Sequence, residues 1–284
     1  MNKQKYFPYL FLAPALILFA LFTVYPIIAS LILSFQRMEQ GEYVFVGLAN
    51  YARLFNDSIF TSALTNTFII FIFQVPIMIF LALILATALN NQLLKLKGFF
   101  RVSFFLPAVT SLVAYSILFS IMLQDEGLFN NILNMVGLSS IPWLSDPFWA
   151  KFSIIMAMTW RWTGYNMVIF LAALQNLSTD VYEAADIDGA GKIRQFFYIT
   201  IPQLKPVILF VAILSTIGTL QLFDEPFNLT GGGPGNSTMT LGLYIYESGF
   251  EYFDFGYASA IAYTVVVLVA ILAFVQFKLT EEKK

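Results

Sequence analysis

The sequence predicts an all-α integral membrane protein with six transmembrane helices, and three observations support this fold class. Hydrophobic residues make up 59% of the 284 residues and charged residues only 11%, against about 45–50% and about 25% in a typical soluble domain. The charges are also unevenly distributed, and they leave long uncharged gaps that can each hold the ~20 apolar residues of a membrane-crossing helix. The ~10-residue alternating segments of a membrane barrel do not occur in the sequence.

Six nearly uncharged gaps define the predicted spans. The first is apolar from residue 9 to about 35, longer than the ~7–15 residue core of a secretory signal, so we expect a span; a cleaved leader is the alternative. The gap at 206–223 is the shortest but lies within the ~17–25 residues that can cross a bilayer. The fourth gap is interrupted only by Arg161. The charged residues that bound the six gaps are Lys5 and Arg37, Asp57 and Lys95, Arg101 and Asp125, Lys151 and Asp180, Lys205 and Asp224, and Asp254 and Lys278.

The basic residues predict the orientation of these spans. Eleven of the 15 Lys and Arg residues fall before the first span, between the second and third, between the fourth and fifth, or after the sixth. All of these positions lie on one side of a six-span chain. Because basic residues accumulate on the cytoplasmic side, both termini are predicted to be cytoplasmic. The eleven residues are Lys3, Lys5, Lys95, Lys97, Arg101, Lys192, Arg194, Lys205, Lys278, Lys283 and Lys284.

The composition also excludes several kinds of chemistry. The chain has no Cys and no His, which removes disulfides, thiolate and imidazole catalysis, and most zinc sites. A net charge of −2 does not suggest nucleic-acid binding. We therefore expect no catalytic residue, no cofactor, no metal and no nucleic-acid partner, and we expect the lipid bilayer to surround the protein.

The segment 180–202, between the fourth and fifth spans, has its own pattern. Thr179 or Asp180 can cap a short helix whose first turn contains Glu183, and Ala184 and Ala185 leave its surface narrow. Glycines at 189 and 191 then end or bend the helix, and a short amphipathic piece follows. Two small helices joined by a turn could fit a groove on a cytoplasmic partner.

This segment resembles the EAA loop of importer permeases in ATP-binding-cassette (ABC) systems. The matching residues are Glu183-Ala184-Ala185, then Gly189 three residues later, and the ending Ile199-x-Ile201-Pro202, where Ile201 replaces the usual leucine. Three further segments resemble the maltose-type, or carbohydrate uptake, branch of these permeases. They are Leu106-Pro107, Phe-Leu-Ala-Ala-Leu-Gln at 170–175, and Leu-Thr-Gly-Gly-Gly-Pro at 229–234.

The resemblance implies a type I ABC importer permease fold in the cell membrane, here the inner or plasma membrane. It implies partners as well: a second homologous permease that forms a heterodimer, two cytoplasmic ATP-binding subunits, and an extracellular or periplasmic solute-binding protein that delivers a sugar. In the family the EAA helix sits in a cleft of the ATPase subunit, so that ATP-driven closure moves the permease. The coupling residues carried onto this chain are Glu183, Ala184, Ala185, Asp188 and Gly189.

Two predicted spans carry candidate sugar-binding residues, because polar groups at membrane depth are costly and often functional. Aromatic faces in the fourth span suit a pyranose ring, although an aromatic belt with Arg161 extended towards the membrane surface is the alternative. A polar stripe in the fifth span suits hydroxyls, although helix packing is the alternative there. In maltose-type relatives these two helices contact the sugar. The candidates are Trp160, Arg161, Trp162, Gly164, Tyr165, Ser215, Thr219 and Gln221.

We expect a single permease domain over 1–284, with the first span and an external loop at 1–60. The remainder, 61–284, forms a five-helix core with the cytoplasmic coupling loop at 176–206. The predicted substrate is a sugar, and the aromatic residues of the fourth span favour a neutral oligosaccharide. A phosphorylated ligand would favour several buried cations, and the spans contain only Arg161. Asp224 and Glu225 form either a solvated rim or a gate. The rival function is a secondary transporter or channel for a small polar solute, not coupled to ATP, which would show membrane-embedded acids or inverted repeats.

Overall fold

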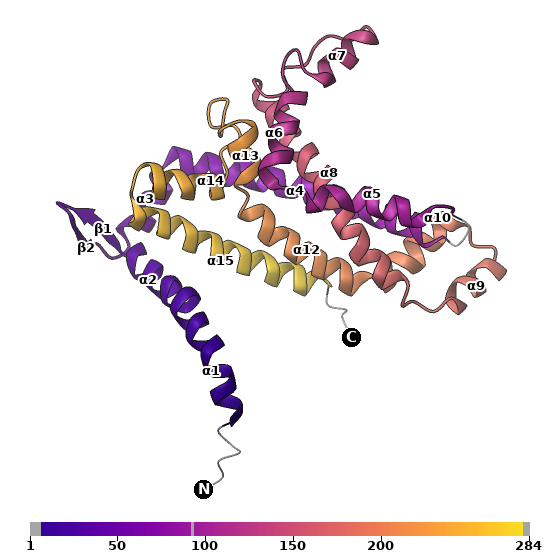
Figure 1. Cartoon of the computed structure of the whole chain (residues 1–284), viewed down its shortest axis with the longest axis horizontal. Coiled ribbons are helices and arrows are strands. Elements are labelled where there is room, and N and C mark those ends of the chain that lie inside the picture. The colour runs from indigo at the N-terminus through magenta and orange to yellow at the C-terminus, as the bar shows by residue number, and fades with distance from the viewer. Residues whose placement is uncertain (1–6, 92–93, 281–284) are drawn as a thin grey trace. The chain divides into compact units, whose positions relative to one another are not determined.

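The computed structural model describes residues 7–91 and 94–280, and most of them are helical (Figure 1). Contacts divide the chain into two compact units. The first consists of Met1–Phe60 and Tyr244–Val266, and the second of Thr61–Leu243 and Val267–Lys284. Helices α4 (Ser58–Asn90) and α15 (Phe255–Thr280) contribute residues to both units.

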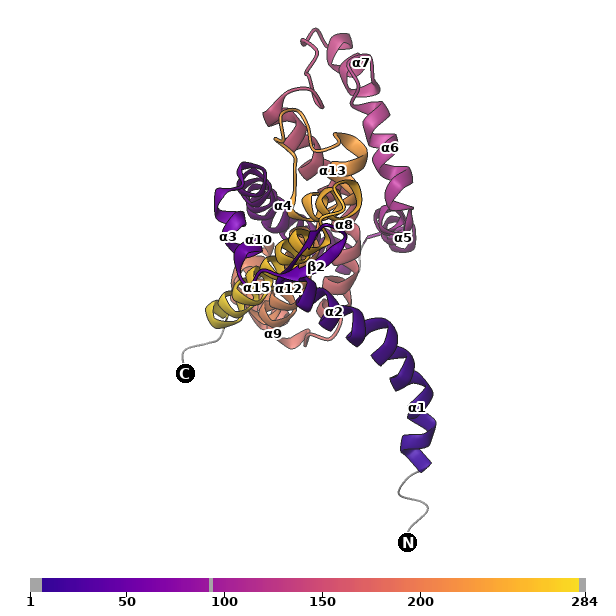
Figure 2. The same ribbon diagram turned by 90° about the vertical axis from the view of Figure 1, so that its left-hand side faces the viewer.

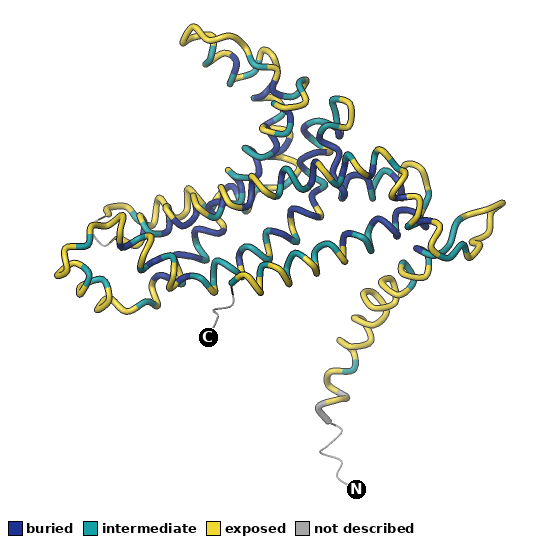
Figure 3. Tube along the Cα trace, turned by 180° about the vertical axis from the view of Figure 1, so that it is seen from behind, coloured by how far each residue is buried: buried dark blue, intermediate teal, exposed yellow. Residues whose placement is uncertain are grey.

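The first unit begins with a long apolar helix that carries one turn of π-helix, η2, in its middle. An 18-residue stretch of this helix contains no buried residue, and the part of the α1 trace that Figure 3 describes is mostly exposed. Such a continuous apolar surface requires lipid or a protein partner. The elements of this unit, besides parts of α4, α15 and α14 (Leu241–Tyr246), are α1 (Phe7–Phe19), η2 (Ala20–Val24), α2 (Tyr25–Ser34), β1 (Gln36–Glu39), β2 (Glu42–Phe45), α3 (Ala49–Asn56) and η4 (Glu247–Glu251).

Strands β1 and β2 form an antiparallel hairpin that the sequence analysis did not predict. Gln36 pairs with Phe45, and Glu39 pairs with Glu42. The two turn residues, Gln40 and Gly41, both have positive φ, at 50° and 92°, as a two-residue hairpin turn requires. The strands have four residues each, so the polar turn residues were the only local signal.

Asp57 forms hydrogen bonds with residues of three helices, α4, α14 and α15, in the first unit. Its carboxylate accepts hydrogen bonds from Tyr244 (2.5 Å) and Tyr257 (2.6 Å), and from the backbone N–H of Ile59 at the start of α4 (2.8 Å). Arg53 of α3 forms an ion pair with Asp254 at 2.7 Å. These polar contacts hold the ends of α3, α4 and α15 where their apolar stretches begin or end.

The second unit contains the remaining helices. Figure 2 shows α6 extending from α5 towards α7, which lies at the end of this branch. The core packs α4 against α8, and the fully buried residues Ala82, Ala86, Met167 and Phe170 form its centre. The other elements are α5 (Lys97–Val109), α6 (Leu112–Met122), α7 (Leu128–Met135), α8 (Pro147–Leu174), α9 (Asp180–Ile187), α10 (Lys192–Gln195), η3 (Phe196–Thr200), α11 (Ile201–Gln203), α12 (Lys205–Leu220) and α13 (Asp224–Leu229).

Described helices that could cross a bilayer occupy five of the six predicted spans, if each bent pair of helices counts as one span. Three are long and apolar enough to cross a bilayer, and two bent pairs raise the number to five if each pair counts as one span. The remaining predicted span corresponds to α8, which has 28 residues, about 42 Å at 1.5 Å per residue. Its length suffices, but Arg161 and its polar neighbours make it less apolar. The three single helices are Phe11–Ser34, Ser58–Asn90 and Phe255–Thr280; the bent pairs are Lys97–Val109 with Leu112–Met122, and Lys192–Gln203 with Lys205–Leu220.

The third predicted span is broken rather than straight. Helices α5 and α6 meet at 97°, and Thr110 between them has an extended conformation. Pro107 lies in the last turn of α5, where its missing N–H leaves the carbonyl of Ser103 without its helical donor. The Thr110 hydroxyl donates to the Pro107 carbonyl at 2.7 Å. The break leaves carbonyl groups at the end of α5 that need other donors.

Helices α5 and α8 pack closely because of Gly164. A Cβ at this position would collide with the backbone carbonyl of Phe104. The neighbouring side chain of Tyr165 stacks against Phe105, with ring centroids 6.5 Å apart. The small residue therefore sets how near the two backbones approach, as small residues do between membrane helices.

Candidate functional site

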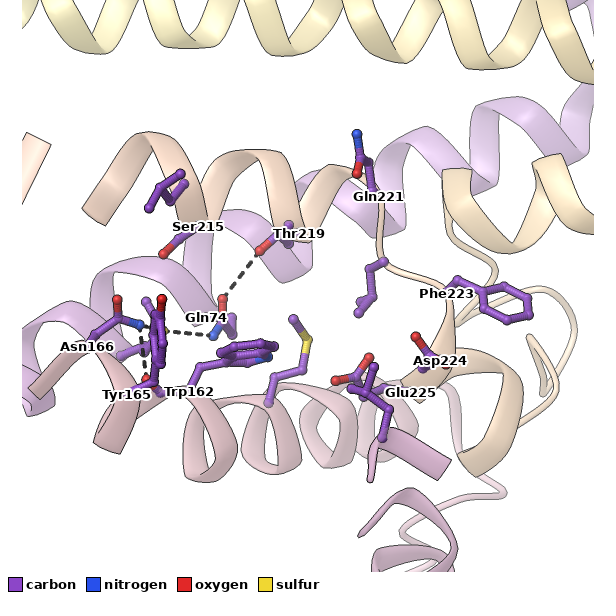
Figure 4. Close-up of a pocket in the computed structure, with 16 residues that line it drawn as sticks. Gln74, Trp162, Tyr165, Asn166, Ser215, Thr219, Gln221, Phe223, Asp224 and Glu225 are labelled. Carbon is purple, nitrogen blue, oxygen red and sulfur yellow. Dashed lines mark hydrogen bonds between the residues drawn. The ribbon is translucent and has the colours of Figure 1, made fainter. Parts of the chain in front are cut away.

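A pocket of about 300 Å³ opens between helices α4, α8 and α12 and the segment that leads into α13. Figure 4 shows side chains from all of these elements directed towards it. All of the lining residues belong to the second unit. They are Gln74, Met78, Leu112, Met158, Trp162, Tyr165, Asn166, Leu214, Ser215, Gly218, Thr219, Gln221, Leu222, Phe223, Asp224 and Glu225.

Amide and hydroxyl groups line one side of the pocket. The Thr219 hydroxyl donates to the Gln74 side-chain carbonyl at 3.5 Å. The amide nitrogens of Gln74 and Asn166 both donate to the sulfur of Met78, at 3.5 and 3.2 Å. A thioether is a weak acceptor, so these buried donors can exchange it for a better acceptor on a ligand.

Two aromatic side chains of α8 form an apolar wall of the same pocket. The rings of Trp162 and Tyr165 meet edge to face with centroids 5.9 Å apart. Tyr165 is 40% exposed, so its ring is accessible from the cavity. An apolar wall with a few convergent polar groups is the usual composition of a small-molecule site.

The structure places the predicted sugar-binding residues in two groups. Trp162 and Tyr165 of α8, with Ser215, Thr219 and Gln221 from α12 and its C-terminal end, line the pocket. Three predicted residues of α8 do not line it. Gly164 faces α5, Trp160 is 46% exposed and packs on Tyr115 and Phe119, and Arg161 points to the break between α5 and α6.

Arg161 supplies donors to the carbonyls that the helix break leaves free. Its guanidinium donates to the backbone carbonyls of Thr110 at 2.9 Å and Ala108 at 3.3 Å. The C-terminal end of a helix carries partial negative charge, which favours a cation there. The side chain is only 4% exposed, so Arg161 is a buried structural cation and does not extend towards the membrane surface.

A buried carboxylate stands at the opposite end of the pocket. Glu225, at the start of α13, is 3% exposed and accepts a hydrogen bond from the hydroxyl of Tyr115 in α6. In the view of Figure 4, Gln74 and Glu225 lie on opposite sides of the Trp162 indole. The pocket therefore offers the amides of Gln74 and Asn166 at one end and the carboxylates of Asp224 and Glu225 at the other.

Helix α4 also contributes to the pocket, which was not predicted from the sequence. Gln74 and Met78 come from the second predicted span, and Met78 lies 88 residues before Asn166, its hydrogen-bond partner in α8. Gln74 is the only polar side chain in the run 68–85, and a lone amide at membrane depth is a signal of function. That signal was present in the sequence but does not indicate which other helix the amide faces.

The predicted coupling loop forms a short helix, a turn and a second short helix. Helix α9 begins at Asp180, with Glu183 in its first turn, and the Ser178 hydroxyl accepts a hydrogen bond from the Asp180 N–H. Gly189 has φ +74°, a left-handed conformation that glycine adopts without strain, and α10 starts three residues later. Glu183, Ala184, Asp188 and Gly189 are exposed and Ala185 is half-buried, so all five face outward or lie near the surface.

Asp186 and Gln195 hold this turn together. The Gln195 amide donates to the Asp186 carboxylate at 2.5 Å and to the Ala190 carbonyl at 2.9 Å. Lys192 forms an ion pair with the same carboxylate at 2.9 Å. The hydrogen bond from Lys192, followed by that from Gln195, lowers the pKa of Asp186 below its usual value.

We expect acid to loosen the turn. A lowered pKa in the folded loop means that the contribution of Asp186 is present at neutral pH and is lost as the pH falls below its ordinary value of about 4. Asp186→Asn should reproduce this effect at pH 7, with faster amide hydrogen exchange across residues 189–195. Asp180→Asn, on the same helix, is the control. Equal exchange in Asp186→Asn and the unmodified chain would contradict the role of this carboxylate.

The spans, the polar pocket between them and the exposed helical loop together define a membrane transport permease. Residues 45–280 match the family model described as binding-protein-dependent transport system inner membrane component. The chain belongs to this family and is a multi-pass inner membrane permease.

Curated relatives cover almost the whole chain. It is 53% identical over 281 residues to the lactose transport system permease protein LacF of Rhizobium radiobacter, an alignment that covers 97% of this chain and 94% of the relative. It is 38% identical over 282 residues to the arabinooligosaccharides transport system permease protein AraP of Halalkalibacterium halodurans, covering 98% and 89%.

A solved structure has the same fold. A chain of a bacterial ABC transporter involved in the import of the acidic polysaccharide alginate superposes with a TM-score of 0.83 at 24% identity, covering 98% of this chain and 96% of that one. The expected importer permease fold is thereby confirmed. The count of six spans and the location of the termini stay predictions.

Proposed function

We propose that this chain is the membrane-spanning subunit of an ATP-driven importer for a neutral sugar, and that the pocket between α4, α8 and α12 contacts the sugar during passage. The observation that carries this proposal is the combination in one cavity of the Trp162 and Tyr165 rings with the amides and hydroxyls of Gln74, Asn166 and Thr219. Aromatic faces complement the C–H face of a sugar ring, and the polar groups complement its hydroxyls. The names of the lactose and arabinooligosaccharide relatives support a sugar as the substrate class.

The proposed arrangement has six spans, both termini in the cytoplasm, and a single permease domain over 1–284. A second, homologous permease completes the membrane unit, and the exposed apolar surface of α1 is available to contact it or lipid. A solute-binding protein delivers the sugar to the outer face. These partners follow from the family and from the resemblance of the coupling segment to the EAA loop.

Coupling to ATP is assigned to the loop around α9. Two cytoplasmic ATP-binding subunits would receive Glu183, Ala184, Ala185, Asp188 and Gly189 in a surface groove. Exposed apolar side chains flank them, including Ile187, which is 86% exposed, and such residues gain from burial against a partner. Binding of ATP and of the loaded binding protein must favour the same conformation for transport to be coupled.

The test is uptake of radiolabelled lactose into proteoliposomes that contain the purified transporter complex. We expect uptake only when both ATP and the binding protein are supplied. Uptake that proceeds without ATP and follows an imposed ion gradient would instead support the rival function, a secondary transporter or channel.

Trp162→Ala tests the pocket. Loss of one aromatic wall should lower the efficiency of sugar transport by roughly ten-fold, since an aromatic contact contributes about 1 kcal/mol beyond the area it buries. The loss should appear mainly as a higher KM for the loaded binding protein or as a lower rate of sugar-stimulated ATP hydrolysis. Phe148→Ala, an exposed aromatic at the start of the same helix and outside the pocket, is the matched control. Equal transport by the two variants would remove Trp162 from the site.

A further inference from the structure

Three polar side chains connect the break in the third span to the wall of the pocket. Arg161 of α8 lies over the ring of Tyr115, with the guanidinium carbon 4.5 Å from the ring centroid. The hydroxyl of Tyr115 donates to the carboxylate of Glu225. Glu225 in turn lines the pocket. The three residues come from α8, α6 and α13, so the carboxylate is held in place by two other helices.

The charges that face the pocket are of one sign. Asp224 and Glu225 both line it, and none of its described lining residues is Lys or Arg. Arg161 does not line the cavity; its positive charge acts on Glu225 from behind the Tyr115 ring, while its guanidinium donates to the carbonyls of Ala108 and Thr110. A ligand in the pocket therefore meets carboxylates without a facing cation.

We propose that Glu225 is a specificity-determining residue that makes the pocket favour neutral sugars and reject sugars that carry a carboxylate. This inference rests on the proposed function, since it requires a sugar to occupy the pocket. A carboxylate has two oxygens and about four acceptor positions, so the bond from Tyr115 leaves capacity for sugar hydroxyls. Hydrogen bonds to an ionised acceptor are stronger than neutral ones.

An acidic sugar encounters the opposite situation. Its carboxylate would approach Asp224 and Glu225 in a cavity with a low local dielectric, where like charges repel strongly. Rejection by a repulsive group is an effective way to obtain specificity. Tyr115 acts as a positioning residue, because its hydroxyl fixes the direction of the Glu225 carboxylate, and Arg161 supports the ring behind it.

The experiment compares two sugars that differ only at carbon six, galactose and galacturonate. Saturation-transfer NMR on the purified transporter complex, without the binding protein, measures a dissociation constant for each sugar. We expect the unmodified complex to bind galactose at least about tenfold more tightly than galacturonate. In Glu225→Gln, which keeps the size of the side chain and removes its charge, this ratio should fall by about tenfold. Glu126→Gln, the same change at an exposed position outside the pocket, should leave the ratio unchanged.

Tyr115→Phe separates positioning from simple packing. It keeps the ring over which Arg161 lies and removes only the hydroxyl that holds Glu225. We expect the sugar ratio to fall about threefold, the effect of one neutral hydrogen bond, with galactose still bound. A purely structural role of the hydroxyl would lower thermal stability and leave the ratio as it is, which would overturn the positioning role.

The remaining outcomes distinguish this inference from the proposed function. If the unmodified complex binds galacturonate as tightly as galactose, or if Glu225→Gln binds galactose with an unchanged ratio, the inference is overturned and the sugar pocket stands. If the unmodified complex gives no saturation-transfer signal with galactose, galacturonate or lactose, the proposed function of the pocket is overturned.

Discussion

Glu183→Lys is expected to abolish transport and transport-linked ATP hydrolysis while membrane insertion stays intact. Glu183 is exposed in the first turn of α9, where the helix dipole favours an acid by about 0.3–1 kcal/mol. Losing this stabilisation by the helix dipole is too small a change to unfold the loop. We expect the large effect at the proposed interface with the ATP-binding subunit, where removing one member of a buried charged contact would cost about 2–5 kcal/mol, or a roughly thirtyfold loss and more.

The measurements are ATP hydrolysis and sugar uptake by the complex in proteoliposomes, together with the amount of permease in the membrane fraction. Asp180→Lys is the matched control, because Asp180 is exposed in the same turn of α9 and lies outside the proposed coupling set. It should retain most of the transport activity. Normal transport by Glu183→Lys, or an equal loss in both variants, would remove Glu183 from the coupling role.

Gly164→Ala is expected to lower the melting temperature of the complex and to reduce transport. The added Cβ would collide with the backbone carbonyl of Phe104 in α5, and a backbone group cannot rotate aside as the end of a flexible side chain can. Overpacking of this kind typically costs about 1–3 kcal/mol, which outweighs the roughly 1 kcal/mol that alanine gains over glycine inside a helix.

The effect should extend to the pocket, because Trp162 and Tyr165 flank Gly164 on α8 and would move with the helix. Thermal unfolding in detergent, followed by light scattering, measures the stability. Gly98→Ala is the control: Gly98 lies in α5, and nothing is within 4 Å of the added Cβ. A melting temperature for Gly164→Ala equal to that of Gly98→Ala would contradict this prediction, because it would show that α5 can move away from α8 without loss of stability.

Residues of the candidate site were predictable to the extent that they interrupt an apolar span. Ser215, Thr219 and Gln221 stand out in this way, and the structure places all three at one cavity. Glu225 was noticed only as part of a rim or gate, because its burial depends on Tyr115 from a distant helix. Gln74 carried a local signal, but its partner Thr219 is 145 residues away in the chain, and no periodicity reports such a contact.

Arg161 shows why position on a helix matters more than residue type. Its charge marked it as a candidate for sugar binding, yet it lies one residue from Trp162 and about 100° around the same helix. That rotation directs Trp162 into the pocket and Arg161 towards the carbonyls at the end of α5. The need for a cation there exists only because α5 and α6 meet at a sharp angle.

Membrane class, span positions and the helical coupling segment could be derived from the chain alone, because hydropathy, charge spacing and local helix signals depend on neighbours in sequence. The face that each helix presents, the break in the third span and the carboxylate end of the pocket required the packed helices. Those features depend on contacts between segments that are far apart in the chain, and such contacts leave no periodic signal in the residues that make them.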